Sequence, residues 1–173
     1  MKNFNIAAKF ENVCQIADEV KSRINTLITP VFMCVGSDKF VADSLGPIVA
    51  EICKKRYGIG AYVYGGLDYN INAINLKESY DYIKTIHPSS QVILIDASLG
   101  DNVGEIIVGD GAFAGMGKTL PTIKMGDISI LGVVGKKAGD FRINSVKLKS
   151  ILNMSEVISK SLALIYGSSN NLY

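Results

Sequence analysis

The sequence predicts an α/β protein with a mixed, mostly parallel β-sheet that is covered by helices on both faces. Three observations support this fold class. Short, almost wholly apolar segments such as 31–35 and 92–95 are typical of strands buried on both faces. These segments alternate along the chain with stretches in which apolar residues recur at helical spacing. Turn-forming glycine and aspartate residues follow the apolar segments, at the sheet edge where such folds bind ligands.

Each expected element follows from a local pattern. In residues 8–27 apolar side chains recur at helical spacing opposite a charged face, and Pro30 ends this helix. Pro47 suits the first turn of the next helix, where a missing N–H is tolerated, and the basic residues before Gly58 suit its last turn. Residues 105–108 predict an additional strand, antiparallel at an edge of the sheet. In chain order we expect helix 8–27, strand 31–35, helix 43–57, strand 61–64, helix 71–87, strands 91–95, 105–108 and 127–134, and helix 148–166.

Length and composition limit the classes of protein to consider. The 173 residues suit one domain, residues 1–173, and 48% of them are hydrophobic, which is enough for a core. The net charge is +2 and the basic residues are scattered, so we expect neither nucleic acid nor a membrane as a partner. The sequence lacks an apolar run of the roughly 18 residues that span a membrane, and the start lacks the pattern of a signal peptide. The three cysteines have no metal-ligand spacing, which predicts free thiols and a cytoplasmic protein.

Two aspartates occupy corresponding places in this pattern. Asp43 lies between the strand at 31–35 and the following helix, and Asp96 comes directly after the apolar segment 92–95. Because the carboxyl ends of neighbouring parallel strands meet at one edge, both carboxylates are expected to face one crevice. Two alternatives stay open. Asp43 or Ser44 caps the helix that follows, and Asp96 is a turn residue.

Other motifs carry weaker predictions. The glycine-rich segment 109–124 predicts a long loop, and loops of this length are commonly functional, so a flap over the crevice is expected. Gly117-Lys118-Thr119 resembles the end of a phosphate-binding P-loop, but that motif needs glycine where Ala112 stands. His87 is interpreted as a solvated residue at a helix end. Four tyrosines are interpreted as packing residues, namely Tyr62, Tyr64, Tyr80 and Tyr82.

Four sequence blocks, in this order, resemble the YyaC family of sporulation proteins. The first is Gly36-Ser-Asp-Lys-Phe-Val-Ala-Asp43-Ser-Leu-Gly-Pro47, and the second is Ile93-Leu-Ile-Asp96-Ala-Ser-Leu-Gly100. Residues 108–111 and 126–134 resemble the later blocks, so the resemblance spans about residues 30–165. The family is similar to the germination protease of spore-forming bacteria and to the hydrogenase maturation endopeptidases.

The resemblance implies a three-layer α/β/α sandwich of the phosphorylase/hydrolase-like type and the activity of a sporulation-associated peptidase. In the germination protease, which degrades small acid-soluble spore proteins, two aspartates are the proposed catalytic pair, and Asp43 and Asp96 match their positions. Gly36, Ser37 and Ser98, in the same signatures, are expected to bind a protein or peptide substrate. A spore protein is one candidate substrate, and the forespore or spore interior is the implied location.

In the maturation endopeptidases the corresponding acids, together with a histidine, contact a metal. Residues 98–126 contain no histidine here, and the sole histidine, His87, precedes the strand at 91–95. We therefore expect no metal and no cofactor. An alternative keeps the site and adds a divalent ion, held by Asp43, Asp96 and another acid.

The chemistry expected of the acid pair needs no further group. Two close carboxylates tend to share one proton, because both cannot ionise cheaply. The ionised one can take a proton from a water that attacks a peptide carbonyl, and the protonated one can assist the carbonyl oxygen and the leaving amine. No histidine lies near a serine or cysteine motif, which disfavours those nucleophiles. The alternative of a different class is a non-catalytic protein that binds a peptide or partner in this crevice.

Overall fold

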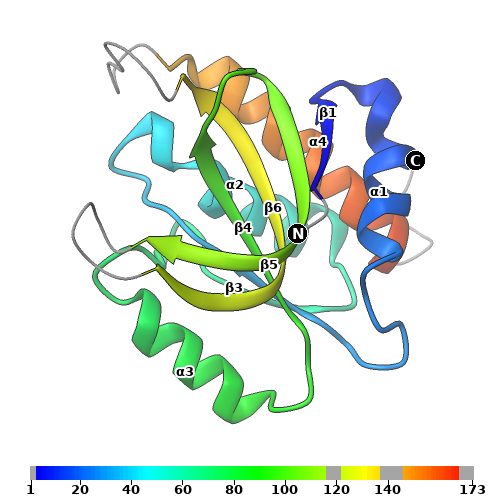
Figure 1. Cartoon of the computed structure of the whole chain (residues 1–173), viewed down its shortest axis with the longest axis vertical. Helices are drawn as coiled ribbons and strands as arrows, with labels where there is room; N and C mark the ends of the chain where they lie inside the picture. Colours follow the sequence, from blue (N-terminus) through cyan, green and yellow to red (C-terminus); the bar gives the residue numbers. More distant parts are fainter. Residues whose placement is uncertain (1–2, 116–121, 137–145, 168–173) are drawn as a thin grey trace.

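The computed structural model describes residues 3–115, 122–136 and 146–167. It contains a six-stranded sheet in the order β1-β5-β6-β4-β2-β3, with helices packed against it (Figure 1). The α/β fold class predicted from the sequence is confirmed. The strands are β1 (Asn3–Ala7), β2 (Val31–Cys34), β3 (Tyr62–Tyr64), β4 (Val92–Leu99), β5 (Glu105–Gly115) and β6 (Thr122–Gly135).

The sheet is mixed, as predicted. Strands β3, β2, β4 and β6 are parallel neighbours, whereas β5 runs antiparallel to β6 and β1 antiparallel to β5. The prediction that the strand at 105–108 forms an edge was wrong, because β1 pairs along it from Glu105 to Gly109 and is itself the edge. Strand β1 was missed because its five residues mix polar and apolar side chains and none of them is fully buried.

The helices are α1 (Val13–Lys21), α2 (Leu45–Glu51), α3 (Leu76–Ile86) and α4 (Leu148–Tyr166). The expected helix at 148–166 is confirmed. The first helix is shorter than the expected 8–27, and Leu27 is 92% exposed, so it does not extend the buried face. Helix α2 continues as the π-helical segment Ile52–Tyr57 and ends at Gly58, whose φ of 50° is left-handed. Within the described ranges, no helix is both long and apolar enough to cross a membrane.

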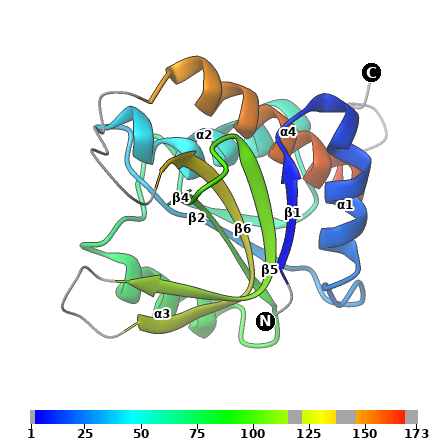
Figure 2. The ribbon, with the colours of Figure 1, turned by 45° about the horizontal axis from the view of Figure 1, so that its top comes forward.

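Two hydrophobic clusters, one on each face of the sheet, make a three-layer arrangement. Alternate residues of β2 belong to different clusters. Phe32 and Cys34 lie on one face of the sheet, and Val31 and Met33 lie on the other. The first cluster joins the sheet to α1, α2 and α4, and the second joins it to α3. Figure 2 shows α3 on the opposite side of the sheet from α2 and α4. This burial on both faces explains why the parallel strands are almost wholly apolar.

The glycine-rich segment forms a hairpin instead of the loop expected at 109–124. Residues 105–115 and 122–135 pair as β5 and β6, and only 116–121 lie outside the described residues. A Cβ at Gly126 would come within 2.9 Å of both the Ala112 side chain and the Val92 carbonyl oxygen. Glycine therefore permits close strand approach here. Ala112 and Met125 pack in the cluster below α3, so this part of the hairpin is core.

Candidate active site

The candidate site lies at the carboxyl end of the central parallel strands. Strand β2 ends at Cys34, which pairs with Ile95, and Asp96 is the next residue of β4. The prediction that Asp96 follows its strand was wrong, because β4 continues to Leu99 by pairing with β6. Asp96 nevertheless lies at the edge where β2 no longer covers β4, so its position beside the end of β2 was predicted correctly.

Asp43 reaches the same edge through a tight turn after β2. It is the last residue of a 3₁₀ turn, η2 (Val41–Asp43), and its carbonyl oxygen accepts the Ser37 N–H at 2.9 Å. Gly36 has a φ of +137°, and a Cβ there would lie 2.0 Å from the Asp43 carbonyl oxygen. A Cβ at Gly46 would lie 2.1 Å from the Val35 carbonyl oxygen. These two glycines let η2 and the start of α2 contact the strand ends directly.

A cavity of about 250 Å³ opens between η2 and the last part of β4. Among the described residues that line it, Asp43 alone has a charged side chain, and the β4 residues that follow Asp96 form the facing wall. Phe40 and Leu99 leave 53% and 43% of their surfaces exposed, so the rim of the cavity is apolar. The lining residues are Phe40, Ala42, Asp43, Ala97, Ser98, Leu99 and Val134.

The two aspartates have different proton affinities. The pKa of Asp96 is raised to about 7: burial is the largest cause, the Ala97 N–H, 2.7 Å from Oδ1, opposes it, and the charge of Asp43 adds a smaller rise. Burial also raises the pKa of Asp43, opposed by the Ser37 backbone. The charge of Asp43 is the smallest of the three causes that act on the pKa of Asp96. Near neutral pH this pair can hold one proton, on Asp96, beside an ionised Asp43.

The structure does not bear out the two alternative interpretations of the aspartates, a helix cap by Asp43 or Ser44 and a turn at Asp96. The N-cap of α2 is Ser44, which makes no side-chain capping hydrogen bond, and its hydroxyl donates to the Val41 carbonyl at 2.9 Å. Asp96 lies inside a strand and not in a turn. Asp43 therefore lines the cavity and Asp96 directly precedes its β4 wall, and neither has the capping or turn function that commonly explains such residues.

The expected substrate-binding residues are only partly brought together. Ser98 lines the cavity, and its Oγ lies 3.5 Å from the Gly132 carbonyl oxygen. Gly36 donates its N–H to the Ile71 carbonyl at 2.7 Å, which serves the fold. The Ser37 side chain is buried and its Oγ accepts the Lys39 N–H at 3.3 Å. Substrate contact by these three residues stays a prediction.

Sequence reasoning missed the apolar rim. The signal available in the sequence was a phenylalanine, Phe40, in a turn and a leucine, Leu99, at the end of a strand. Both side chains are exposed in the structure. Sequence reasoning placed His87 correctly at a helix end, since His87 is the C-cap of α3, but missed its contacts: the ring is only partly exposed, it stacks on Tyr62 with centroids 3.9 Å apart, and Nε2 lies 2.8 Å from the Tyr64 hydroxyl.

The residues present do not fit a metal site of the maturation-endopeptidase kind. Over the described part of the chain, no three His, Cys, Asp or Glu side chains lie close enough together to hold an ion. His87, at the end of α3, stacks on Tyr62 and lies within hydrogen-bond distance of the Tyr64 hydroxyl. The alternative of a third acid beside Asp43 and Asp96 therefore has no candidate among these residues.

Comparison with known proteins places the chain in a family. Residues 4–161 match the family described as "Protein of unknown function (DUF1256)". The chain belongs to the DUF1256 family. Its sequence is 34% identical over 141 residues to "Uncharacterized protein YyaC" of Bacillus subtilis (strain 168), covering 78% of this chain and 68% of that protein. The predicted relationship to YyaC is therefore confirmed.

A solved structure with a similar arrangement is the NiFe hydrogenase maturation protease HycI from Thermococcus kodakarensis KOD1. The similarity covers 86% of this chain and 98% of that one, with a TM-score of 0.47 and 16% identity.

Proposed function

We propose that this DUF1256 protein is a peptidase that hydrolyses peptide bonds with Asp43 and Asp96. The observation that carries the proposal is the raised pKa of Asp96, about 7, beside a second carboxyl that faces an open cavity. Acids in a cleft with shifted pKa values are typical of catalytic sites. The resemblance of both signatures to those of the germination protease supports the choice of reaction.

In this mechanism ionised Asp43 takes a proton from a water molecule whose oxygen bonds to the peptide carbonyl carbon. Protonated Asp96 donates a hydrogen bond to the carbonyl oxygen as negative charge develops there. The C–N bond then breaks and the amine nitrogen receives a proton from the pair. After release, one proton again remains on the two carboxyls, so the cycle needs no other reactant than water.

The cavity also suggests the substrate. Phe40, Leu99 and Val134 offer apolar contacts on both sides of Asp43, which suits a peptide with an apolar side chain near the scissile bond. The resemblance to the germination protease favours a spore protein as its source. The three cysteines are free, which suits a reducing compartment such as the cytoplasm or forespore.

The test compares the wild-type protein with Asp43→Asn and Asp96→Asn on a peptide library, with cleavage products detected by mass spectrometry. Asp38→Asn, an exposed acid in the same turn, is the matched control. We expect the cleavage rate of each site variant to be at least about a hundredfold lower than that of the wild type. The control should cleave at the wild-type rate. Full cleavage by both site variants, all folded by circular dichroism, would contradict the dyad.

A second candidate is a non-catalytic peptide-binding protein. The exposed Phe40 and Leu99 favour this function as well, since contiguous apolar surface around a cleft is typical of binding sites. Saturable binding of library peptides by the wild-type protein, without any product, would establish it in place of the peptidase.

A further inference from the structure

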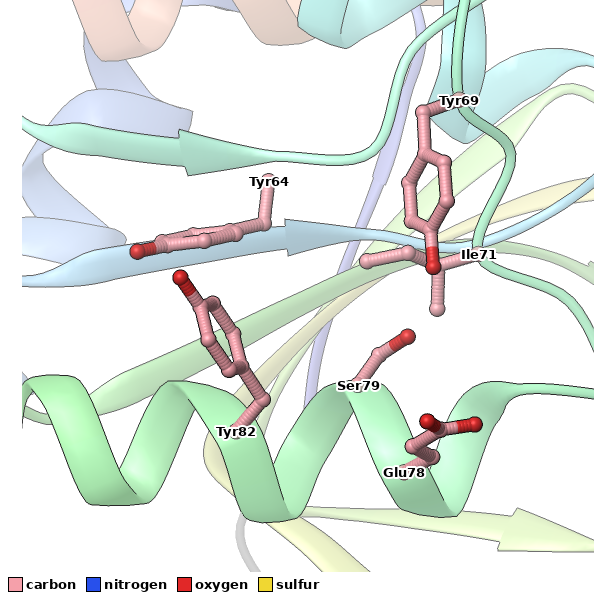
Figure 3. A pocket seen from close by; sticks show the side chains of 6 residues that line it. All are labelled: Tyr64, Tyr69, Ile71, Glu78, Ser79 and Tyr82. Carbon is pink, nitrogen blue, oxygen red and sulfur yellow. The ribbon is translucent and has the colours of Figure 1, made fainter.

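A second cavity, of about 270 Å³, lies on the α3 side of the sheet (Figure 3). Tyr64 comes from the end of β3, and Ser79 and Tyr82 from α3. The connection between these elements passes the carboxyl end of β2, where Ile71 bridges Val35. The lining residues are Tyr64, Tyr69, Ile71, Glu78, Ser79 and Tyr82. We call this cavity the tyrosine pocket.

The aromatic rings form walls of the tyrosine pocket. The rings of Tyr64 and Tyr82 lie 6.3 Å apart at 72°, an edge-to-face arrangement. In Figure 3 the Tyr69 hydroxyl points toward Ile71 and Ser79, and the Tyr82 hydroxyl points toward Tyr64. Tyr69 and Tyr82 are 64% and 57% exposed, so packing alone does not account for them. The rings leave π-electron surface open to a ligand.

Among the described residues that line the tyrosine pocket, the polar side-chain atoms are oxygens and no side chain is a cation. Glu78 has no ion-pair partner in the described part of the chain, whereas its neighbour Lys77 pairs with Asp81. The Ser79 hydroxyl has no hydrogen-bond partner among the same residues. The pocket therefore presents a carboxylate, hydroxyl oxygens and ring faces, all of which attract positive charge.

We propose that the tyrosine pocket binds a primary alkylammonium group, such as the end of a lysine side chain in a peptide. An ammonium has three N–H donors for oxygen acceptors and is attracted to aromatic faces within about 6 Å. A cavity of about 270 Å³ is at the small end of ligand sites, which suits one side chain better than a nucleotide. The inference does not rest on the proposed peptidase function, because none of these residues belongs to the acid pair.

The test titrates ¹⁵N-labelled protein with Nα-acetyl-lysine methylamide and, as a neutral match, with the same compound acetylated on Nε. We expect saturable shifts of amide signals around residues 64–82 with the ammonium probe, and binding of the neutral probe at least about fivefold weaker. Glu78→Gln and Tyr82→Leu should each weaken binding about two- to fivefold. Glu11→Gln, an exposed acid on the opposite face, should leave binding unchanged.

Two further measurements identify the kind of ligand and test whether its binding is independent of the acid pair. A pentapeptide with a central lysine should bind more tightly than n-butylammonium; equal affinity would indicate a free amine as the ligand. The double variant Asp43→Asn/Asp96→Asn should bind as the wild type does, even if peptide cleavage is never observed. The proposal is overturned by the absence of saturation with the ammonium probe, by equal binding of the neutral probe, or by unchanged affinity in folded Glu78→Gln and Tyr82→Leu.

Discussion

The carboxyl of Asp96 is the side chain on which the candidate site depends. It lies on a core strand at the point where β2 ends, so it is poorly solvated, and the three residues that follow it line the cavity. Burial is the larger cause of its raised pKa and the charge of Asp43 is the smaller one. Such a carboxyl keeps its proton near neutral pH, where an ordinary aspartate has lost it. The proposed base, Asp43, lines the cavity, and the proposed acid, Asp96, directly precedes the β4 residues that line it.

This raised pKa makes the stability of the protein depend on pH. The folded protein holds the Asp96 proton up to about pH 7, whereas the unfolded chain releases it near the ordinary aspartate pKa of 3.8, so stability falls as pH rises between them. The difference corresponds to at most about 4 kcal/mol. The Asp96→Asn substitution removes this loss of stability, and the asparagine side-chain oxygen can still accept the Ala97 N–H.

We therefore expect the free energy of unfolding of Asp96→Asn, relative to that of the wild type, to increase by about 1–3 kcal/mol from pH 4 to pH 8. Urea unfolding at both pH values measures this difference. The exposed Asp38→Asn serves as the control. A stability difference between Asp96→Asn and wild type that does not change with pH would contradict a buried, protonated Asp96.

The same two carboxyls set the pH dependence of the proposed hydrolysis. Asp96 must be protonated, so the rate should fall as pH rises above about 7. Asp43 must be ionised, and because burial raises its pKa, the rate should fall on the acid side before the ordinary carboxyl range is reached. The measurement is kcat/KM across pH on a cleaved library peptide. A rate that still increases above pH 8 would exclude Asp96 as the acid.

At the scale of elements, close backbone contacts hold α2 and η2 against the strand ends. Gly46 lies in the first turn of α2, and a Cβ there would be 2.1 Å from the Val35 carbonyl oxygen and 2.7 Å from the Val35 nitrogen. Both are backbone atoms of the central sheet, so the helix would have to move. Movement of α2 would also displace Asp43, which is joined to the helix through its N-cap residue, Ser44.

We expect Gly46→Ala to destabilise the protein by about 1–3 kcal/mol or more and to impair the site, as measured by urea unfolding and peptide cleavage. Gly60→Ala is the matched control, because its Cβ would meet only the Tyr166 carbonyl oxygen at 3.4 Å. Its stability should stay within about 1 kcal/mol of wild type. Equal stability of the two variants would mean that α2 does not contact the sheet in this way.

Strand β1 protects the edge of the sheet. It pairs with β5 over Asn3 to Ala7, and its loss would leave a row of unpaired backbone groups on β5. We expect a variant that lacks residues 1–7 to unfold at a lower temperature and to self-associate, as measured by thermal unfolding and sedimentation velocity. A monomeric variant of unchanged melting temperature would contradict this function of β1.

Over the whole molecule, the elements buried on both faces were the ones that the sequence predicted well. Strands β2 and β4 and helix α4 are apolar because they lie between or against layers. The part of the β5–β6 hairpin at 109–124 was mistaken for a loop, because glycines of the hairpin, such as Gly109 and Gly126, permit close strand approach instead of forming turns. The edge strand β1 has too little burial to produce a periodic pattern.

The candidate site was predictable only in part, for a similar reason. Asp43 and Asp96 were predicted from their places beside parallel strands, a rule that holds for open α/β sheets in general. The cavity walls come from separate elements, as Phe40 and Val134 do, and their meeting depends on the strand order. The tyrosine pocket likewise joins Tyr64 to α3 across a connection that has no regular pattern.

We propose that Asp43 and Asp96 interact and that Asp96 holds the shared proton. The most direct test is ¹³C NMR titration of both side-chain carboxyls in the wild type, and of Asp96 in Asp43→Asn. We predict that Asp96 titrates near pH 7 in the wild type, and at a lower pH, still above 3.8, once the charge of Asp43 is removed. Titration of both carboxyls near the ordinary value, unaffected by that substitution, would contradict the claim.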